Sequence, residues 1–231
     1  MWFRMLDPVY WVFALPALIL ALIAQAWVRS SYRKYLQVPN RAGMTGLEVA
    51  QQLMRGAGLS LNVERAPGEL ADHYDPRSGT LRLSPGVARR ASVASLAIVA
   101  HELGHAQQDV QGYLPMRLRT GLVPLVNFTS WLGPILFFVG LMLNAEGLAQ
   151  LGILTFAGAV VFALVTLPVE INASHRGLQM LRRSGLLADQ EEHAGVRRVL
   201  TAAALTYVAA LAQAISNLLY YIFLLGGRQR D

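Results

Sequence analysis

Residues 91–105, ASVASLAIVAHELGH, join an apolar run to a pair of histidines four positions apart. On a helix such a pair lies on one face, so the imidazoles of His101 and His105 can converge on one metal ion. Between them, Glu102 can take a proton from a zinc-activated water and hand it to a leaving amine. A chance match is the alternative, but the motif needs a helical context, and the apolar run supplies one. The stretch therefore predicts the metal-bearing helix of a zinc hydrolase.

Four long stretches without charged residues indicate a membrane protein. They cover residues 8–28, 120–145, 147–169 and 199–227, and each is long enough to cross a bilayer as a helix. A cleaved signal peptide is an alternative for the first stretch, because AQA at residues 24–26 resembles a cleavage site. The basic residues that follow, such as Arg29 and Arg33, favour a membrane anchor instead. We expect transmembrane helices at 8–29, 120–145, 147–169 and 199–227.

The distribution of basic residues predicts the orientation in the membrane. Residues 30–120 carry 11 Lys and Arg and residues 170–200 carry 5, whereas the turn at 144–147 carries none. Because cytoplasmic segments are rich in Lys and Arg, we expect 30–119 to be a cytoplasmic catalytic segment and 170–198 a second cytoplasmic segment of a multi-pass plasma (inner) membrane protein. Both chain ends would then lie outside, although the tail at 228–231 is basic. The net charge of +6 fits attraction to anionic lipid and is not evidence for nucleic acid.

Local signals predict a small α+β arrangement between the first two membrane stretches. Thr45 and Glu48 form a capping box that opens an amphipathic helix with Leu47 on its apolar face. A strand is expected at 59–65, and a hairpin at 70–74 and 80–83. Ser84-Pro85 then starts a helical turn, and Ser92 starts the helix that carries the two histidines to about residue 110.

A catalytic zinc site needs a third protein ligand, and His₂Glu is one common set. The chain has no cysteine, so the ligands must be imidazoles and carboxylates. Glu170 is the best candidate, because an unpaired carboxylate at the end of a membrane stretch is costly and a cation would offset that cost. The alternatives are Glu170 at the lipid interface or paired with Arg176, and Glu191 or Glu192 as the ligand instead.

The order of these features resembles the YugP-type membrane zinc metallopeptidases (neutral zinc metallopeptidases) and, more distantly, the HtpX and CaaX-prenyl-protease group. The resemblance covers nearly the whole chain, and its most specific parts are DHYDP at 72–76, the motif at 101–108 and PVEINAS at 168–174. It implies that Glu170 is the third zinc ligand. The wider group has E-x-x-A-D at this place; Glu170 and Ala173 match, while Ser174 replaces the aspartate. That departure leaves open which group orients the zinc histidines.

Two further roles follow from the resemblance and from chemistry. The hairpin strand around His73 and Tyr74 would pair with an extended substrate, although an ordinary edge strand is the alternative. The oxyanion of a tetrahedral intermediate needs a donor, for which His175, Arg176 and His193 are candidates. Each of these three is more often a surface side chain.

Taken together, the sequence predicts a mainly α integral membrane protein with four transmembrane helices and a small cytoplasmic α+β zincin-like metallopeptidase domain. We expect a zinc-dependent endopeptidase that acts on membrane or membrane-proximal polypeptides, with Zn²⁺ as its cofactor and the lipid bilayer as its environment. An oligomer or an accessory membrane partner is compatible with this prediction. A zinc-stabilised membrane scaffold or partner-binding protein without significant proteolysis is the alternative, but a structural site has no need of the base Glu102.

Overall fold

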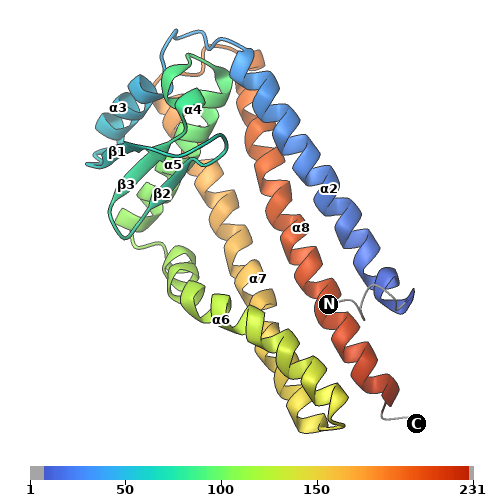
Figure 1. The fold of residues 1–231 in the computed structure, drawn as a ribbon. Helices are drawn as coiled ribbons and strands as arrows, with labels where there is room; N and C mark the ends of the chain where they lie inside the picture. The colour runs from blue at the N-terminus through green and yellow to red at the C-terminus, as the bar shows by residue number, and fades with distance from the viewer. Residues whose placement is uncertain (1–7, 229–231) are drawn as a thin grey trace. The chain divides into compact units, whose positions relative to one another are not determined.

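The computed structural model describes residues 8–228, so the predicted external N-terminus and residues 229–231 of the predicted external tail lie outside the described residues. Along the chain the elements are α2 (Pro8–Gln37), α3 (Gly46–Ala57), β1 (Asn62–Arg65), β2 (His73–Asp75), β3 (Thr80–Leu83), α4 (Pro85–Arg89), α5 (Val93–Val110), α6 (Leu114–Met142), α7 (Glu146–Arg183) and α8 (Gln190–Arg228) (Figure 1). They divide into two compact units. The sheet-bearing unit comprises Gln25–Arg117 and Pro168–Leu205, and the helical unit comprises residues 8–24, 118–167 and 206–228.

Within residues 8–228, four helices are long and apolar enough to cross a membrane, as the sequence predicts. They are Pro8–Gln37, Leu114–Met142, Glu146–Arg183 and Gln190–Gly227. Each extends beyond its apolar stretch. The expected segment 170–198 is therefore largely helical: α7 continues 13 residues past Glu170 to Arg183, and α8 begins at Gln190. The break between them falls at Gly185, whose φ of 70° ends a helix readily. Charged residues mark the end of an apolar span, but they do not stop a helix.

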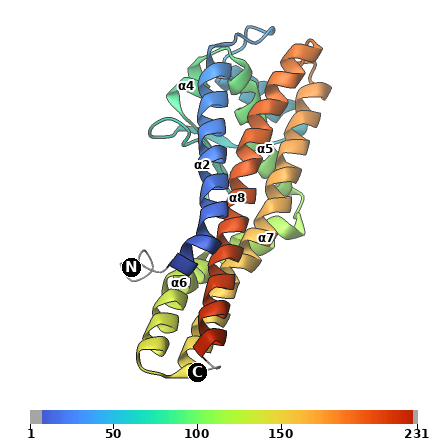
Figure 2. The same cartoon turned by 90° about the vertical axis from the view of Figure 1, so that its right-hand side faces the viewer.

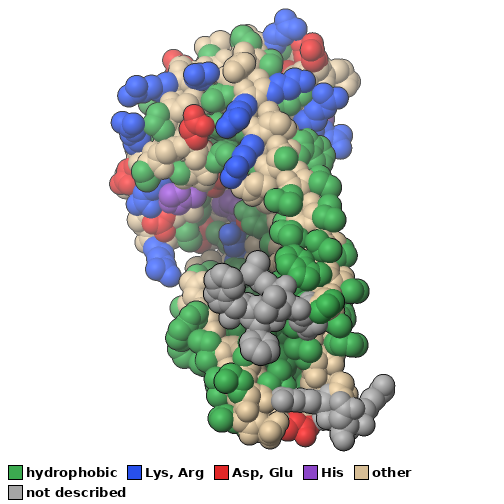
Figure 3. All heavy atoms as spheres, turned by 45° about the vertical axis from the view of Figure 1, so that its right-hand side comes forward, with side chains coloured by type: hydrophobic (Ala, Val, Ile, Leu, Met, Phe, Trp, Pro, Cys, Tyr) green, Lys and Arg blue, Asp and Glu red, His purple; other side chains and the backbone are tan. Residues whose placement is uncertain are grey.

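The helical unit has an aromatic core. Phe137 stacks on Tyr221 with ring centroids 4.6 Å apart, and both side chains are buried. Helices α6 and α7 approach closely, because a Cβ added at Gly140 would lie 2.4 Å from the backbone nitrogen of Ala149. The outer surface is apolar, with Leu154 71% exposed, and hydrophobic side chains cover this unit on the face shown in Figure 3. Such a surface suits a lipid environment.

The sheet-bearing unit confirms the predicted hairpin and the strand expected at 59–65, which is observed at Asn62–Arg65 and pairs in parallel. Strand β3 lies in the middle of the sheet order β1-β3-β2, parallel to β1 and antiparallel to β2. The predicted capping box of Thr45 and Glu48 is present at the start of α3. Leu47, however, is 41% exposed, whereas Val49 is fully buried. The prediction for Leu47 was wrong because Gly46, Val49 and residues 50 and 53 form the buried face.

Helix α5 is the central element of this unit. Ser92 caps its start, as predicted, by accepting a hydrogen bond from the backbone N–H of Ser95. Its apolar side chains are almost all buried in one core, which includes Leu96, Val99 and Leu103 at 0% exposure. Parts of three long helices also belong to this unit, and the part of α8 up to residue 205 lies between the parts of α2 and α7 (Figure 2). The position of the two histidines is therefore fixed by the packing of the whole helix.

Two glycines allow α5 and α7 to cross in direct backbone contact. A Cβ at Gly104 would lie 2.2 Å from the carbonyl oxygen of Ala173, and one at Gly177 would lie 2.6 Å from that of Ala100. Backbone atoms at such distances cannot move aside as a side chain can. The glycine of the H-E-L-G-H motif is thus explained by helix packing.

Gly104→Ala is expected to destabilise the protein by about 1–3 kcal/mol, the usual cost of overpacking a close contact. Gly56→Ala is the matched control, since Gly56 is also helical and a Cβ there meets nothing within 4 Å. The control should be neutral or slightly stabilising, because Ala favours a helix over Gly. Thermal unfolding of the detergent-purified proteins measures both effects. Equal stability of the two variants would contradict the packing argument.

Candidate metal centre

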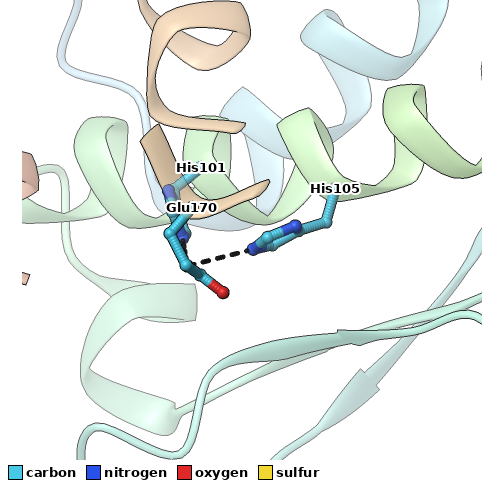
Figure 4. Close-up of side chains that lie close together, drawn as sticks. All are labelled: His101, His105 and Glu170. Carbon is cyan, nitrogen blue, oxygen red and sulfur yellow. Dashed lines mark hydrogen bonds and ion pairs between the residues drawn. The ribbon is translucent and has the colours of Figure 1, made fainter. Parts of the chain in front are cut away.

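Three side chains from two helices converge in the sheet-bearing unit. The Nε2 atoms of His101 and His105 lie 3.2 and 3.4 Å from the same carboxylate oxygen, Oε2 of Glu170 (Figure 4). One ligand atom from each residue lies within 4.8 Å of the others. Glu170 is 1% exposed and His105 is 7% exposed. These three residues could hold a metal ion.

The local structure explains the convergence. His101 and His105 are one turn apart on α5, and their rings meet edge to face with centroids 4.8 Å apart. Glu170 lies within α7, on the face that packs against α5 through Ala173 and Gly177. It sits where the apolar stretch ends, as expected, but inside a continuous helix instead of at a helix end.

The residues fit a zinc ion by chemistry and by spacing. Imidazole nitrogen and carboxylate oxygen are normal zinc ligands, and His₂Glu is a known catalytic set. Ligand atoms about 2.0–2.1 Å from a tetrahedral zinc ion lie roughly 3.3 Å from one another. The distances from Glu170 Oε2 to the two Nε2 atoms, 3.2 and 3.4 Å, agree with that separation. Three protein ligands also leave one position for water or substrate.

The outer ring nitrogens of both histidines have polar neighbours. His101 Nδ1 lies 3.1 Å from the Ser174 hydroxyl, and His105 Nδ1 lies 3.1 Å from Oε1 of Gln108. Ser174, which stands where the wider group has an aspartate, is therefore the polar neighbour of His101 that the sequence had not identified. Sequence reasoning did not single out Gln108. Its position could have identified it, because Gln108 follows His105 by three residues and so lies on the same face of the helix. In the structure its side chain is completely buried.

Glu102 is buried between α5 and the sheet. It is 9% exposed, and its Oε2 accepts a hydrogen bond from the backbone N–H of Tyr74 at 2.9 Å. Burial raises the pKa of the Glu102 carboxyl to about 7. A carboxyl with a pKa near neutrality can both accept and return a proton.

The predicted substrate strand lies beside this carboxylate. His73 is exposed at the start of β2. The Tyr74 side chain is buried, and its hydroxyl donates to Oδ2 of Asp109 at 2.8 Å, which ties β2 to α5. Strand β2 is an edge strand of the sheet.

The three oxyanion candidates have other neighbours. His175 is exposed, with Nε2 2.8 Å from Nε2 of Gln179, and His193 Nε2 lies 2.6 Å from Nη2 of Arg182. Arg176 donates to Asn172 at 2.6 Å. Among the described residues, none of the three belongs to the cluster of ligand atoms. Their role as oxyanion donors stays a prediction.

The rival carboxylates lie apart from the cluster. Glu191 is exposed near the start of α8. Glu192 is buried, and it accepts hydrogen bonds from the backbone N–H groups of Arg41 and Ala188, both at 2.9 Å. It therefore stabilises the turn before α8, and neither residue is among the described groups that could hold a metal.

Comparison with known proteins agrees with this geometry. The chain is 42% identical over 217 residues to a protein of Bacillus subtilis (strain 168) named "Putative membrane protease YugP". The matched region covers 93% of this chain and 96% of that protein. No solved structure matches the chain. A family described as "putative neutral zinc metallopeptidase" matches residues 10–226. Because that match takes in every residue of the ligand cluster and nearly the whole sequence, the chain belongs to this family of zinc metallopeptidases.

Proposed function

We propose that this protein is a zinc-dependent membrane endopeptidase that hydrolyses peptide bonds of membrane or membrane-proximal polypeptides by a metal-activated water. The observation that carries the proposal is the pairing of a three-ligand cluster with a buried carboxylate outside the cluster, Glu102. A structural zinc site usually closes all four positions with protein ligands and needs no adjacent base. The family and the named relative support the same activity.

In this proposal His101, His105 and Glu170 hold zinc, which supplies a Lewis acid that polarises a peptide carbonyl and acidifies water. Glu102 accepts the proton of the attacking water and later returns it to the leaving amine. Its burial raises its pKa, which makes the carboxylate a stronger base for the first step.

The edge of β2 that faces away from β3 is the proposed substrate site. Tyr74 pairs with Leu81 of β3, yet its N–H is directed to Glu102. In an antiparallel pair the N–H and C=O of one residue point to the same side, so the Tyr74 carbonyl also faces away from β3. An extended polypeptide can add to this edge through main-chain hydrogen bonds, with His73 at its exposed rim. The scissile bond would then lie beside Glu102.

Glu102→Gln should retain zinc but lose hydrolysis, because the amide keeps the size of the side chain and an oxygen for the Tyr74 N–H while losing basicity. The rate should fall by roughly 10²–10⁴-fold, the usual contribution of a general base. Zinc content and peptide cleavage are measured on the same detergent-purified samples. Wild-type cleavage by the variant would exclude the mechanism.

Glu170→Gln should weaken zinc binding by at least the roughly 10–100-fold that the loss of an outer-shell partner costs, since a ligand charge is removed. Glu191→Gln is the matched control, because Glu191 is an exposed glutamate outside the ligand cluster. Zinc affinity is measured by competition with a chromophoric chelator. Equal affinity of the two variants would show that another group is the third ligand.

The proposed orientation places the metal centre on the cytoplasmic side of the plasma membrane. Because the chain has no cysteine, single cysteines can report it. Gly147→Cys, in the exposed turn that starts α7, should react with a membrane-impermeant maleimide added outside intact cells. Ser78→Cys, in the exposed hairpin turn, should react only after lysis. The opposite pattern would place the site outside.

A further inference from the structure

A chain of hydrogen bonds leads from His105 to a guanidinium on α7. The buried Gln108 amide lies between them: its Oε1 faces His105 Nδ1, and its Nε2 donates to the carbonyl oxygen of Val169 at 2.9 Å. The same Nε2 donates to Oδ1 of Asn172 at 3.0 Å. That Asn172 oxygen also accepts from Nε of Arg176 at 2.6 Å.

Arg176 is held in place by further contacts. Its Nη1 donates to Oε1 of Gln107 at 3.2 Å and to Oε1 of Gln111. Its guanidinium lies 5.6 Å from the centre of the Tyr113 ring, within range of a cation–π interaction. The side chain is therefore bound on several sides to the last turn of α5 and the residues that follow it.

The guanidinium of Arg176 and the carbonyl of Val169 determine the direction of every hydrogen bond in this series. A guanidinium only donates, so the oxygen of Asn172 must face Arg176. A backbone carbonyl only accepts, so the amide nitrogen of Gln108 must face Val169. Both hydrogens of that nitrogen are then used, and the Gln108 oxygen is left for His105. An oxygen acceptor at Nδ1 requires a proton on Nδ1, so a neutral His105 ring carries its lone pair on Nε2, the atom that lies 3.4 Å from Oε2 of Glu170.

We propose that Gln108, Asn172 and Arg176 are positioning residues that hold His105 in the Nδ1–H tautomer, with its Nε2 lone pair directed at the metal. The inference rests on the proposed zinc site and adds how one ligand is prepared for it. The other histidine is prepared differently, because the Ser174 hydroxyl beside His101 can donate as well as accept and imposes no direction. The two ligands thus differ in how strongly their tautomers are fixed.

The test measures zinc affinity of the full-length protein in detergent after removal of metal, with a chromophoric chelator as competitor. Gln108→Met should weaken binding by roughly 10–100-fold, as expected for loss of the partner of a metal-bound histidine. Arg176→Met should weaken it by roughly 2–10-fold, the lower range of couplings inside one hydrogen-bond network. Arg176→Lys keeps a pure donor and should restore most of the affinity. Arg183→Met, which removes an exposed arginine from the same helix, should have no effect.

The double variant separates positioning from general destabilisation. With Gln108→Met already present, Arg176→Met should cause no further loss of zinc affinity, because its effect passes through Gln108.

Wild-type zinc affinity in Arg176→Met would overturn the inference while leaving the peptidase proposal intact. Losses that multiply fully in the double variant would overturn it as well. Zinc binding with the expected losses, but no peptide cleavage by the wild type, would refute the proposed function and support the inference.

Discussion

The direct contact between the backbones of α5 and α7 is the constraint on which the metal centre depends. Gly104 and Gly177 allow it, since a Cβ at either position would meet a main-chain oxygen within 2.6 Å. Only at this separation can the short side chain of Glu170 reach the imidazoles of His101 and His105. The same contact excludes water, so the carboxylate is almost fully buried and needs the nearby positive or polar groups. The packing of the fold and the assembly of the candidate metal site therefore both require the close approach of α5 and α7.

Local signals made much of this protein predictable. The capping residues Thr45 and Ser92 start helices where the sequence indicates, because a cap depends only on its immediate neighbours. Apolar stretches of about 20 residues or more identify the four candidate spans for the same reason. The pair His101 and His105 shares a face through helical periodicity alone. Glu170 was predicted from its place at the end of an apolar stretch and from the resemblance.

The remaining features depend on contacts between distant segments, which a sequence pattern does not encode. The parallel pairing of β1 with β3 joins strands separated in sequence by β2, so no turn motif between them predicts the pairing. Gln108 and Asn172 look like ordinary polar residues until the helix crossing brings them together. Arg176 resembled a surface cation, and its partners, Gln107 on α5 and Gln111 just after it, lie 69 and 65 positions away. The end of α7 at Arg183 was missed because charge limits a membrane span and not a helix.

The ligand set also determines how the site responds to oxidants. Thiolate ligands can be oxidised to sulfenic acid or drawn into disulfides, and either reaction releases the metal. Imidazoles and a carboxylate take no part in thiol exchange, and this chain contains no cysteine elsewhere that could form a disulfide. Peroxide or a shift in the glutathione pool would thus cause no thiol oxidation at the candidate ligands His101, His105 and Glu170. Metal would therefore not be lost through oxidation of a ligand thiol.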